Sequence, residues 1–157
     1  MVTTDPIAQL SGLAKRLVLD GLLAEEMAAD AQQKALKSRE PFVSYLVENK
    51  ILDSLAIASS ACQEFGTPLF DLAAMELDAA PISLVDEKLI RQHHTLPLFK
   101  RGNRLFVAVS DPTNLQALDE IKFHTGISTE TILVEEDKLV KAIDMALDSA
   151  DTSMADL

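Results

Sequence analysis

Two stretches of the sequence repeat one apolar pattern, 29 residues apart. The first, LAKRLVLDGLL, begins at Leu13, and the second, FVSYLVENKIL, begins at Phe42, so that Leu17 aligns with Leu46. A repeat length of about 20 to 50 residues usually marks one supersecondary unit used twice, with apolar faces that bury each other. We therefore expect two copies of a helical unit. The alternative is that two unrelated amphipathic helices resemble each other by chance.

The first copy is expected to be a pair of helices. Apolar residues recur every three or four positions, which is the spacing of an amphipathic helix. Asp5 followed by Pro6 predicts the start of the first helix, and Gly21 predicts its end. Glu25 and the acid after it suit the positive end of a second helix dipole. The expected apolar face of this second helix consists of Met27, Ala28, Ala31 and Ala35.

The second copy repeats this arrangement after the polar break KSREP. Phe42 opens its first helix, Asp53 offers the N-cap of its closing helix, and Gly66 ends it. Residues 5–66 are therefore predicted to form a small bundle of four helices, built from two helix-turn-helix copies.

Beyond Gly66 the pattern changes to short apolar runs bounded by proline, glycine and aspartate, which are typical of strands. The runs at 67–72, 105–110 and 129–134 are predicted strands, and the turn at Gly102 joins LPLFK to RLFVAVS in a hairpin. Helices are expected at 83–93, at 137–147, and after the cap at 111–114. The expected inward side of this helix contains Leu115, Leu118, Ile121, Phe123 and the stem of Lys122.

These elements predict an α+β chain in which the helical bundle is followed by an α/β subdomain with a mixed sheet and a hairpin. The α/β subdomain is expected to span residues 67–148. Residues 149–157 are small and polar, and we expect them to begin a linker to further domains.

Charge and composition exclude several classes of function. Acidic residues outnumber basic ones by 25 to 14, for a formal net charge of −11, which argues against binding to a phosphate backbone. The one cysteine, Cys62, cannot form an internal disulfide and is expected to be a small core residue. No signal peptide is evident, and no apolar run reaches the ~18 residues of a membrane span. We expect a soluble, cytoplasmic chain that does not insert into the membrane.

A search for catalytic chemistry finds none. The phosphate-binding patterns GxxxxGK[ST] and GxGxxG do not occur. His93, His94 and His124 fall at predicted helix ends, where capping or solvated roles are expected, and no CxxC or HExxH spacing completes a metal site. The acids at 135–137 suit the first turn of a helix. We therefore expect no catalytic, cofactor-binding or metal-binding residue, and no enzyme activity in this chain.

Three stretches carry a resemblance to a known family. LSGLAKRLVLDGLL, EKLIRQHHTLPLFKRGNRLFVAVSDPTN and ALDEIKFHTGISTETILVEEDKLVKAID together resemble the N-terminal regulatory domains of the type II secretion and type IV pilus assembly ATPases, most closely those of the pilus extension ATPases. The middle stretch, a helix ending in RQH followed by LPL, a hairpin and a strand into SDPTN, is specific to this family. The resemblance implies that ATP and Mg²⁺ belong to other domains of a hexameric ATPase.

Many relatives in that family bind cyclic di-GMP through two 24-residue motifs, RLGxxLxxxGLLxxxxLxxALxxQ, separated by five residues, and the 29-residue offset agrees with this spacing. The polar residues fit poorly. The opening arginine falls on Gly12 and Pro41, and the closing glutamine falls on Ala35 and Glu64. The leading glycine is also lost in both copies, and the second glycine survives only in the first. An anionic dinucleotide needs guanidinium groups and approachable backbone, so direct affinity should be largely lost.

The resemblance therefore implies a regulatory binding module that acts in type IV pilus biogenesis and twitching motility. In some relatives this domain docks the small adaptor PilZ, which links to a cyclic di-GMP receptor. We expect PilZ to bind the helical half, and the motor domains of the same protein to contact the α/β half or the linker. The expected PilZ contacts are Leu10, Leu13, Leu17 and Met27 on an apolar stripe, and the alternative is that all four are ordinary core residues.

Two other functions stay open. One is a direct cyclic di-GMP sensor, favoured by the 29-residue spacing and by Gly21. The other is a structural domain that positions motor subunits or contacts the inner-membrane pilus platform, which would place this cytoplasmic chain at the periphery of the inner membrane.

Overall fold

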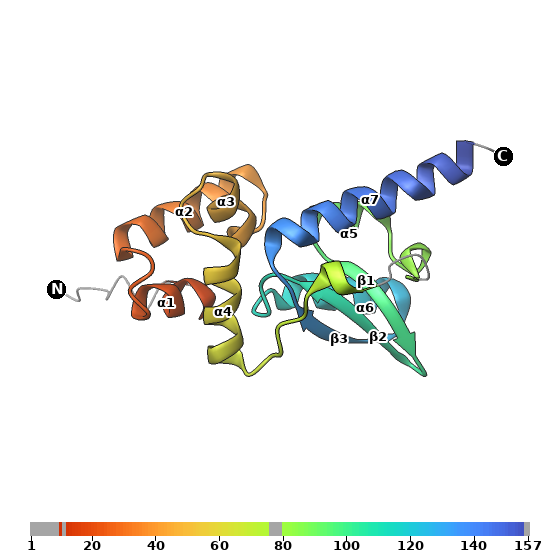
Figure 1. Ribbon diagram of the computed structural model, residues 1–157, viewed down its shortest axis with the longest axis horizontal. Helices are drawn as coiled ribbons and strands as arrows, with labels where there is room; N and C mark the ends of the chain where they lie inside the picture. Colours follow the sequence, from red (N-terminus) through yellow and green to blue (C-terminus); the bar gives the residue numbers. More distant parts are fainter. Residues whose placement is uncertain (1–9, 11, 76–79, 156–157) are drawn as a thin grey trace.

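The chain folds into two halves that lie side by side (Figure 1). The computed structural model describes residue 10 and residues 12–75 and 80–155. The predicted helix start at Asp5 and Pro6 lies outside the described residues. The helical half contains α1 (Gly12–Leu19), α2 (Glu25–Ser38), α3 (Phe42–Glu48) and α4 (Ser54–Phe65). These four helices confirm the predicted helical bundle.

The first helix of each repeat copy ends in the same backbone conformation. The N–H of Gly21 donates to the carbonyl of Val18, and 29 residues later the N–H of Lys50 donates to that of Val47, over 3.0 and 3.1 Å. Both residues have positive φ, 74° at Gly21 and 56° at Lys50. The left-handed conformation turns the chain out of one helix toward the next, so one helix ending is used twice.

The core of the helical half is built from small and branched side chains at helical spacing. Leu13 and Leu17 of α1 and Leu46 of α3 are all fully buried. Ala28 and Ala31 of α2 pack into the same cluster, because small side chains allow neighbouring helices to approach closely. Cys62, expected in the core, is partly buried and packs against this cluster.

The α/β half has a three-stranded mixed sheet. Strand β1 (Leu96–Arg101) pairs antiparallel with β2 (Arg104–Val109), which pairs parallel with β3 (Ser128–Leu133). The tight turn at Gly102 joins β1 to β2 and confirms the predicted hairpin. The helical elements of this half are η2 (Leu72–Ala74), η3 (Ile82–Leu84), α5 (Glu87–His93), α6 (Leu115–Thr125) and α7 (Glu136–Ala155).

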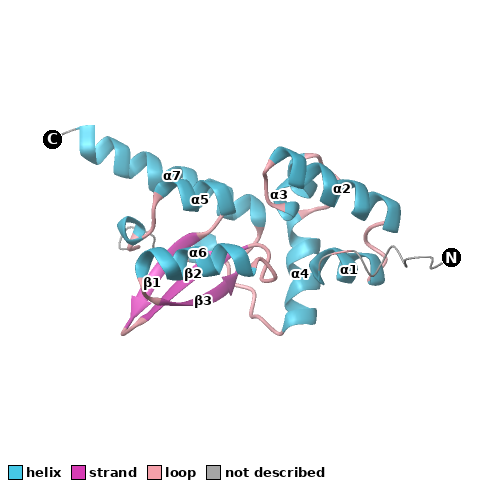
Figure 2. Cartoon of the chain, turned by 180° about the vertical axis from the view of Figure 1, so that it is seen from behind, coloured by secondary structure: helices cyan, strands magenta, loops and turns pink. Residues whose placement is uncertain are grey.

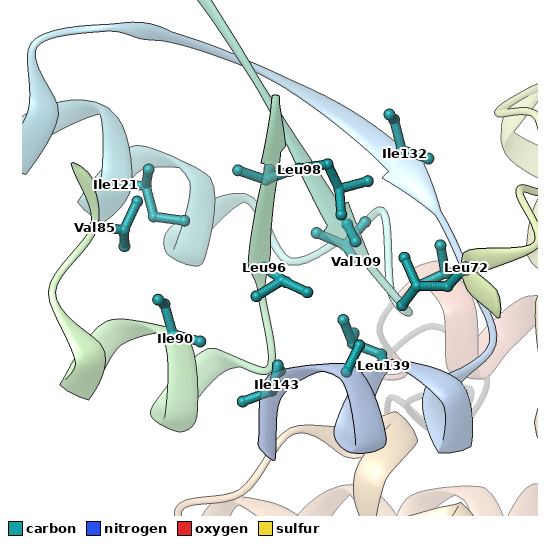
Figure 3. Close-up of a cluster of buried hydrophobic side chains, with 14 of the residues drawn as sticks. Leu72, Val85, Ile90, Leu96, Leu98, Val109, Ile121, Ile132, Leu139 and Ile143 are labelled. Carbon is teal, nitrogen blue, oxygen red and sulfur yellow. The ribbon is translucent and has the colours of Figure 1, made fainter. Parts of the chain in front are cut away.

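The sheet carries helices that bury their apolar sides against it. Figure 3 shows Ile90 of α5 and Leu139 and Ile143 of α7 gathered around Leu96 of β1. In Figure 2, α6 lies in front of the strands, and its buried residues Ala117 and Ile121 form its inner side. The α+β fold predicted from the sequence is confirmed.

Two details of this half differ from the sequence prediction. Residues 67–72 do not form a strand, because this segment meets the sheet only at the bridge between Leu69 and Leu133 and then enters the short helix η2. On α6, Leu115, Phe123 and the stem of Lys122 were expected to face inward, but all three residues are exposed. The predicted inward residues Leu118 and Ile121 do pack in the core, and Ala117, which was not predicted, is buried as well.

The last helix connects the two halves. The backbone N–H of Asp137 donates to the Oγ of Ser54 on α4 over 3.2 Å, and Leu133 just before the helix packs into the core of the helical half. Helix α7 continues through residues 149–155, where we expected a linker to begin. A helical segment can still connect domains, so the linker stays a prediction. Among the described helices, none is long and apolar enough to cross a membrane.

Candidate functional site

A groove of about 520 Å³ runs along the joint between the two halves. One wall is the end of α2 and the turn that follows it, including Arg39 and Phe42. The other wall is the end of α5 together with the loop between β2 and α6, which contains Asp111 and Thr113. The groove therefore exists only because the two halves pack together.

The loop of the second wall is held by local hydrogen bonds that its sequence encodes. The Oδ1 of Asp111 accepts from the N–H of Thr113 at 2.9 Å and from its Oγ1 at 2.5 Å. Three residues after Asp111, Asn114 caps α6 by accepting from the N–H of Ala117 at 3.4 Å. Burial raises the pKa of Asp111, and the two hydrogen bonds from Thr113 only partly oppose this. The predicted capping role of this loop is confirmed, and the loop also forms a wall.

The first wall depends on a residue in an unusual conformation. Arg39 caps α2 with φ at 57°, in the left-handed region, and its N–H reaches the carbonyls of Ala35 and Leu36. Because of this turn, the chain reverses at Pro41 and enters α3. Arg39 lines the groove, and so does Gln32, two turns of helix earlier.

Three of the four polar positions of the family motif lie at this joint. Ala35 and Pro41 line the groove itself. At Gly12, a Cβ atom would lie 3.4 Å from the Cγ2 of Thr113, so this position abuts the same loop. Glu64 lies apart, because its Oε2 pairs with the Nη1 of Arg16 at 2.6 Å. Two motif positions thus line the groove and a third abuts its loop, but the arginine side chains of the motif are absent from Gly12 and Pro41.

Arg16 does not substitute for the missing arginines. Its Nε also pairs with the Oδ2 of Asp20 at 3.0 Å, so two carboxylates share its charge. Ser60 donates a further hydrogen bond to Asp20, and this bond, with that from Arg16, lowers the pKa of Asp20. The cluster fastens α1 to α4 and offers little unbalanced positive charge to an anion.

A second polar cluster lies inside the joint. The Nδ1 of His94 lies 2.5 Å from the Oε1 of Glu136, and the Glu136 side chain is only 2% exposed. Burial of His94 opposes protonation. The bond to Glu136 and the charges of Glu136, Glu48 and Glu40 outweigh burial and raise the pKa of His94. The pKa of Glu40 is also raised, by burial and by the nearby carboxylate of Glu48. Charges from both halves therefore meet at His94.

Comparison with known proteins decides the family. Residues 65–153, more than half of the chain, match the MshEN domain. The chain belongs to the MshEN domain family. The type IV pilus assembly ATPase PilB of Pseudomonas aeruginosa is 44% identical over 149 residues, which cover 95% of the chain and 26% of that protein. PilB of Acinetobacter baylyi is 38% identical over 141 residues, covering 90% and 24%. The chain thus spans about a quarter of the length of these curated relatives.

Two solved structures have the same fold as this MshEN domain. The N-terminal domain of XpsE matches with a TM-score of 0.67 at 16% identity, over 92% of the chain and 97% of that structure. A structure of MshE with cdg matches with a TM-score of 0.58 at 24% identity, over 85% and 96%. At these identities the two structures establish the fold, and the predicted resemblance is confirmed.

The structure corrects the contact residues that we expected on the helical half of the chain. Leu13 and Leu17 are 0% exposed, so neither can meet a partner while the domain stays folded. Their apolar stripe forms the core of the bundle. Leu10 is partly buried against that core, and Met27 is half exposed. Leu10 and Met27 therefore stay predictions.

Several residues of the joint were not identified from the sequence. Arg39 was treated as part of a polar break, and Gln32 was not considered. His94 caps α5, in line with the expected capping role, but the rings of His93 and His94 are not solvated, because His93 pairs with Glu120 at 2.8 Å and His94 pairs with Glu136. The one sequence signal that could have pointed to Arg39 was its charge and its position at the end of the predicted second helix. Among the described residues of the MshEN domain, no group of His, Cys, Asp or Glu side chains could hold a metal ion.

Proposed function

We propose that this MshEN domain is a regulatory protein-binding module of a type IV pilus extension ATPase and that it docks a PilZ-type adaptor. The observation that carries the proposal is a set of exposed apolar side chains at the end of the helical half. Leu19 is 64% exposed, Leu22 39% and Met27 50%. We call these three residues the distal apolar end. Leu19 ends α1, Leu22 lies in the connection between α1 and α2, and Met27 lies in the first turn of α2; in Figure 1 this connection lies at the end of the bundle away from the sheet.

Contact with a protein partner explains the distal apolar end better than packing within the fold does. Burying apolar surface contributes roughly 25 cal/mol per Å², and none of this gain is realised while the three side chains face water. An apolar cluster on one end of a domain is a common mark of a protein interface. Leu10, which precedes α1, is retained as a candidate contact because it is partly exposed.

The proposal is tested by reversing the polarity of this surface. A Leu19→Asp, Met27→Asp double variant should weaken binding of the cognate PilZ protein at least about tenfold, because each aspartate would have to lose its water in the interface. Leu36→Asp is the matched control. Leu36 is also exposed and lies on α2, but at the opposite end, beside the groove.

Calorimetric titration would measure the three affinities, with circular dichroism as the check on folding. Unchanged PilZ affinity in the folded double variant, or an equal loss in the control, would remove the distal apolar end as the docking site.

A direct cyclic di-GMP sensor is a second candidate, favoured by the groove. Arg39 and Gln32 bring a guanidinium and an amide close to the motif positions Pro41 and Ala35. These groups could bind a phosphate and a base edge. Against this, no motif arginine is present at Gly12 or Pro41. An Arg39→Ala variant tests this candidate. If the nucleotide binds in the groove, the variant should bind cyclic di-GMP more weakly than the wild type.

A structural role is the third candidate. The domain would then position motor subunits or contact the inner-membrane pilus platform, from the cytoplasmic side. This role requires binding to a pilus platform protein, and binding to neither PilZ nor cyclic di-GMP. Catalysis and ATP binding would belong to other domains of the longer protein.

A further inference from the structure

The outer side of α6 exposes two large apolar side chains that the fold does not use. Phe123 is 89% exposed and Leu115 is 64% exposed, although α6 buries Ala117 and Ile121 on its other side. Leu115 and Phe123 are eight residues apart, which is about two turns of helix and brings them to one side. This side of α6 belongs to the sheet-containing half and is separate from the distal apolar end.

Acidic groups surround the more exposed of these side chains. A hollow of about 570 Å³ is lined by Phe123, His124, Gln116, Asp119 and Glu120. The rings of Phe123 and His124 meet edge to face, with centroids 6.3 Å apart. Glu120 is tied to His93 at 2.8 Å, and this hydrogen bond lowers the pKa of Glu120 and favours its charged form. The hollow therefore combines an aromatic wall with carboxylates.

This combination selects a cationic side chain. Lysine and arginine place their charge over an aromatic ring while pairing with a carboxylate, and each contact contributes ~0.5–1 kcal/mol at an exposed site. The same chain uses this contact elsewhere, since the guanidinium of Arg101 lies 5.3 Å from the ring centroid of Phe99. The net charge of −11 attracts basic partners and repels anionic membranes, nucleic acids and further copies of the chain.

We propose that the outer side of α6 is a docking surface for a basic amphipathic segment of a protein partner. A lysine or arginine of that segment occupies the hollow between Asp119 and Phe123, and an apolar side chain of the segment packs against Leu115. Charge draws the partner in, and the apolar contacts fix its position.

The first test uses a synthetic amphipathic helical peptide of leucine and lysine, titrated into the isotope-labelled chain at low salt. The largest amide shifts should fall in residues 115–124. Phe123→Ser should weaken binding at least about tenfold, and Asp119→Asn should weaken it about threefold and reduce its salt dependence. Both side chains are exposed, so neither variant should affect folding.

Met145→Ser is the matched control, because Met145 is 72% exposed and also lies beside an acid, Asp144. Its effect on peptide affinity should stay within about twofold. Shifts spread evenly over the acidic surface, or equal losses in Phe123→Ser and Met145→Ser, would overturn the proposal. It would also be overturned if Phe123 were required instead for self-association or for binding to anionic lipid vesicles.

Discussion

Removing the ring of His94 should lower the free energy of unfolding, because this ring belongs to the polar cluster at the joint between the two halves. His94 caps α5, and its Nδ1 is the hydrogen-bond partner of Glu136 Oε1 at 2.5 Å. The Oε2 of Glu136 is buried and has no partner among the described residues. In a His94→Ala variant, Oε1 would lose its partner as well, and neither oxygen of this buried carboxylate would then have a hydrogen-bond partner among the described residues.

The size of the effect follows from these contacts. A hydrogen bond to a charged group contributes about 1.5–3 kcal/mol, and leaving one member of a buried ion pair unpartnered costs about 3–5 kcal/mol. We expect His94→Ala to lower the free energy of unfolding by about 3 kcal/mol. Adding Glu136→Leu should restore about half of this loss, because the unpartnered buried charge is then gone.

The loss should also depend on pH, in a direction that the pKa of His94 fixes. The folded state raises this pKa above its ordinary value of 6.5, through Glu136, Glu48 and Glu40. The protonated ring therefore contributes stability that is fully present below about pH 6.5 and is lost as the pH rises through the folded pKa. The stability difference between wild type and His94→Ala should be larger at about pH 6 than at about pH 9.

Urea unfolding at the two pH values measures this difference, and an NMR titration of the ring measures the pKa itself. The reasoning is refuted if the difference grows with pH. It is also refuted if His94→Ala changes the free energy of unfolding by less than about 0.5 kcal/mol, which is the range of ordinary surface substitutions.

Four further substitutions test the account of the fold, each by urea unfolding. Leu17→Ala should destabilise by about 2–5 kcal/mol, since Leu17 is fully buried; a loss under about 1 kcal/mol would place it outside the core. Lys50→Gly should stabilise by about 1 kcal/mol, because φ at Lys50 is 56°, while Gly21→Ala at the equivalent position should destabilise by a similar amount; the same sign for both would contradict the repeat. Asn114→Ala should cost about 1 kcal/mol by removing the cap of α6, and no change would show that the cap is unimportant.

Local patterns predicted the repeat and the hairpin because each depends on residues near in sequence. The 29-residue offset follows from matching apolar positions, and both copies form the same helix ending at Gly21 and Lys50. The hairpin follows from strand formers on both sides of Gly102. Such features need no knowledge of how the halves pack.

Features that depend on tertiary packing were predicted less well. The apolar residues of α6 lie on more than one side of the helix, so its sequence did not decide between Phe123 and Ala117 as the inward residue. The segment at 67–72 has the composition of a strand, but it pairs with the sheet only through Leu69. The wide stripe that suggested a contact surface at Leu13 and Leu17 was instead the core of the bundle.

The groove could not be predicted, since its walls come from segments about 70 residues apart that only packing brings together. The sequence did identify Asp111 and Asn114 as capping residues. That Asp111 and Arg39 line the same groove follows only from how the two halves are placed.

The central claim, that this domain is a docking module for a PilZ-type adaptor, is tested most directly by calorimetry. The cognate PilZ protein would be titrated into the purified chain, and cyclic di-GMP would then be added to the same cell. The account predicts saturable heat from PilZ and none from the nucleotide. Heat from the nucleotide without heat from PilZ would contradict it and would make the groove, with Arg39, the functional site.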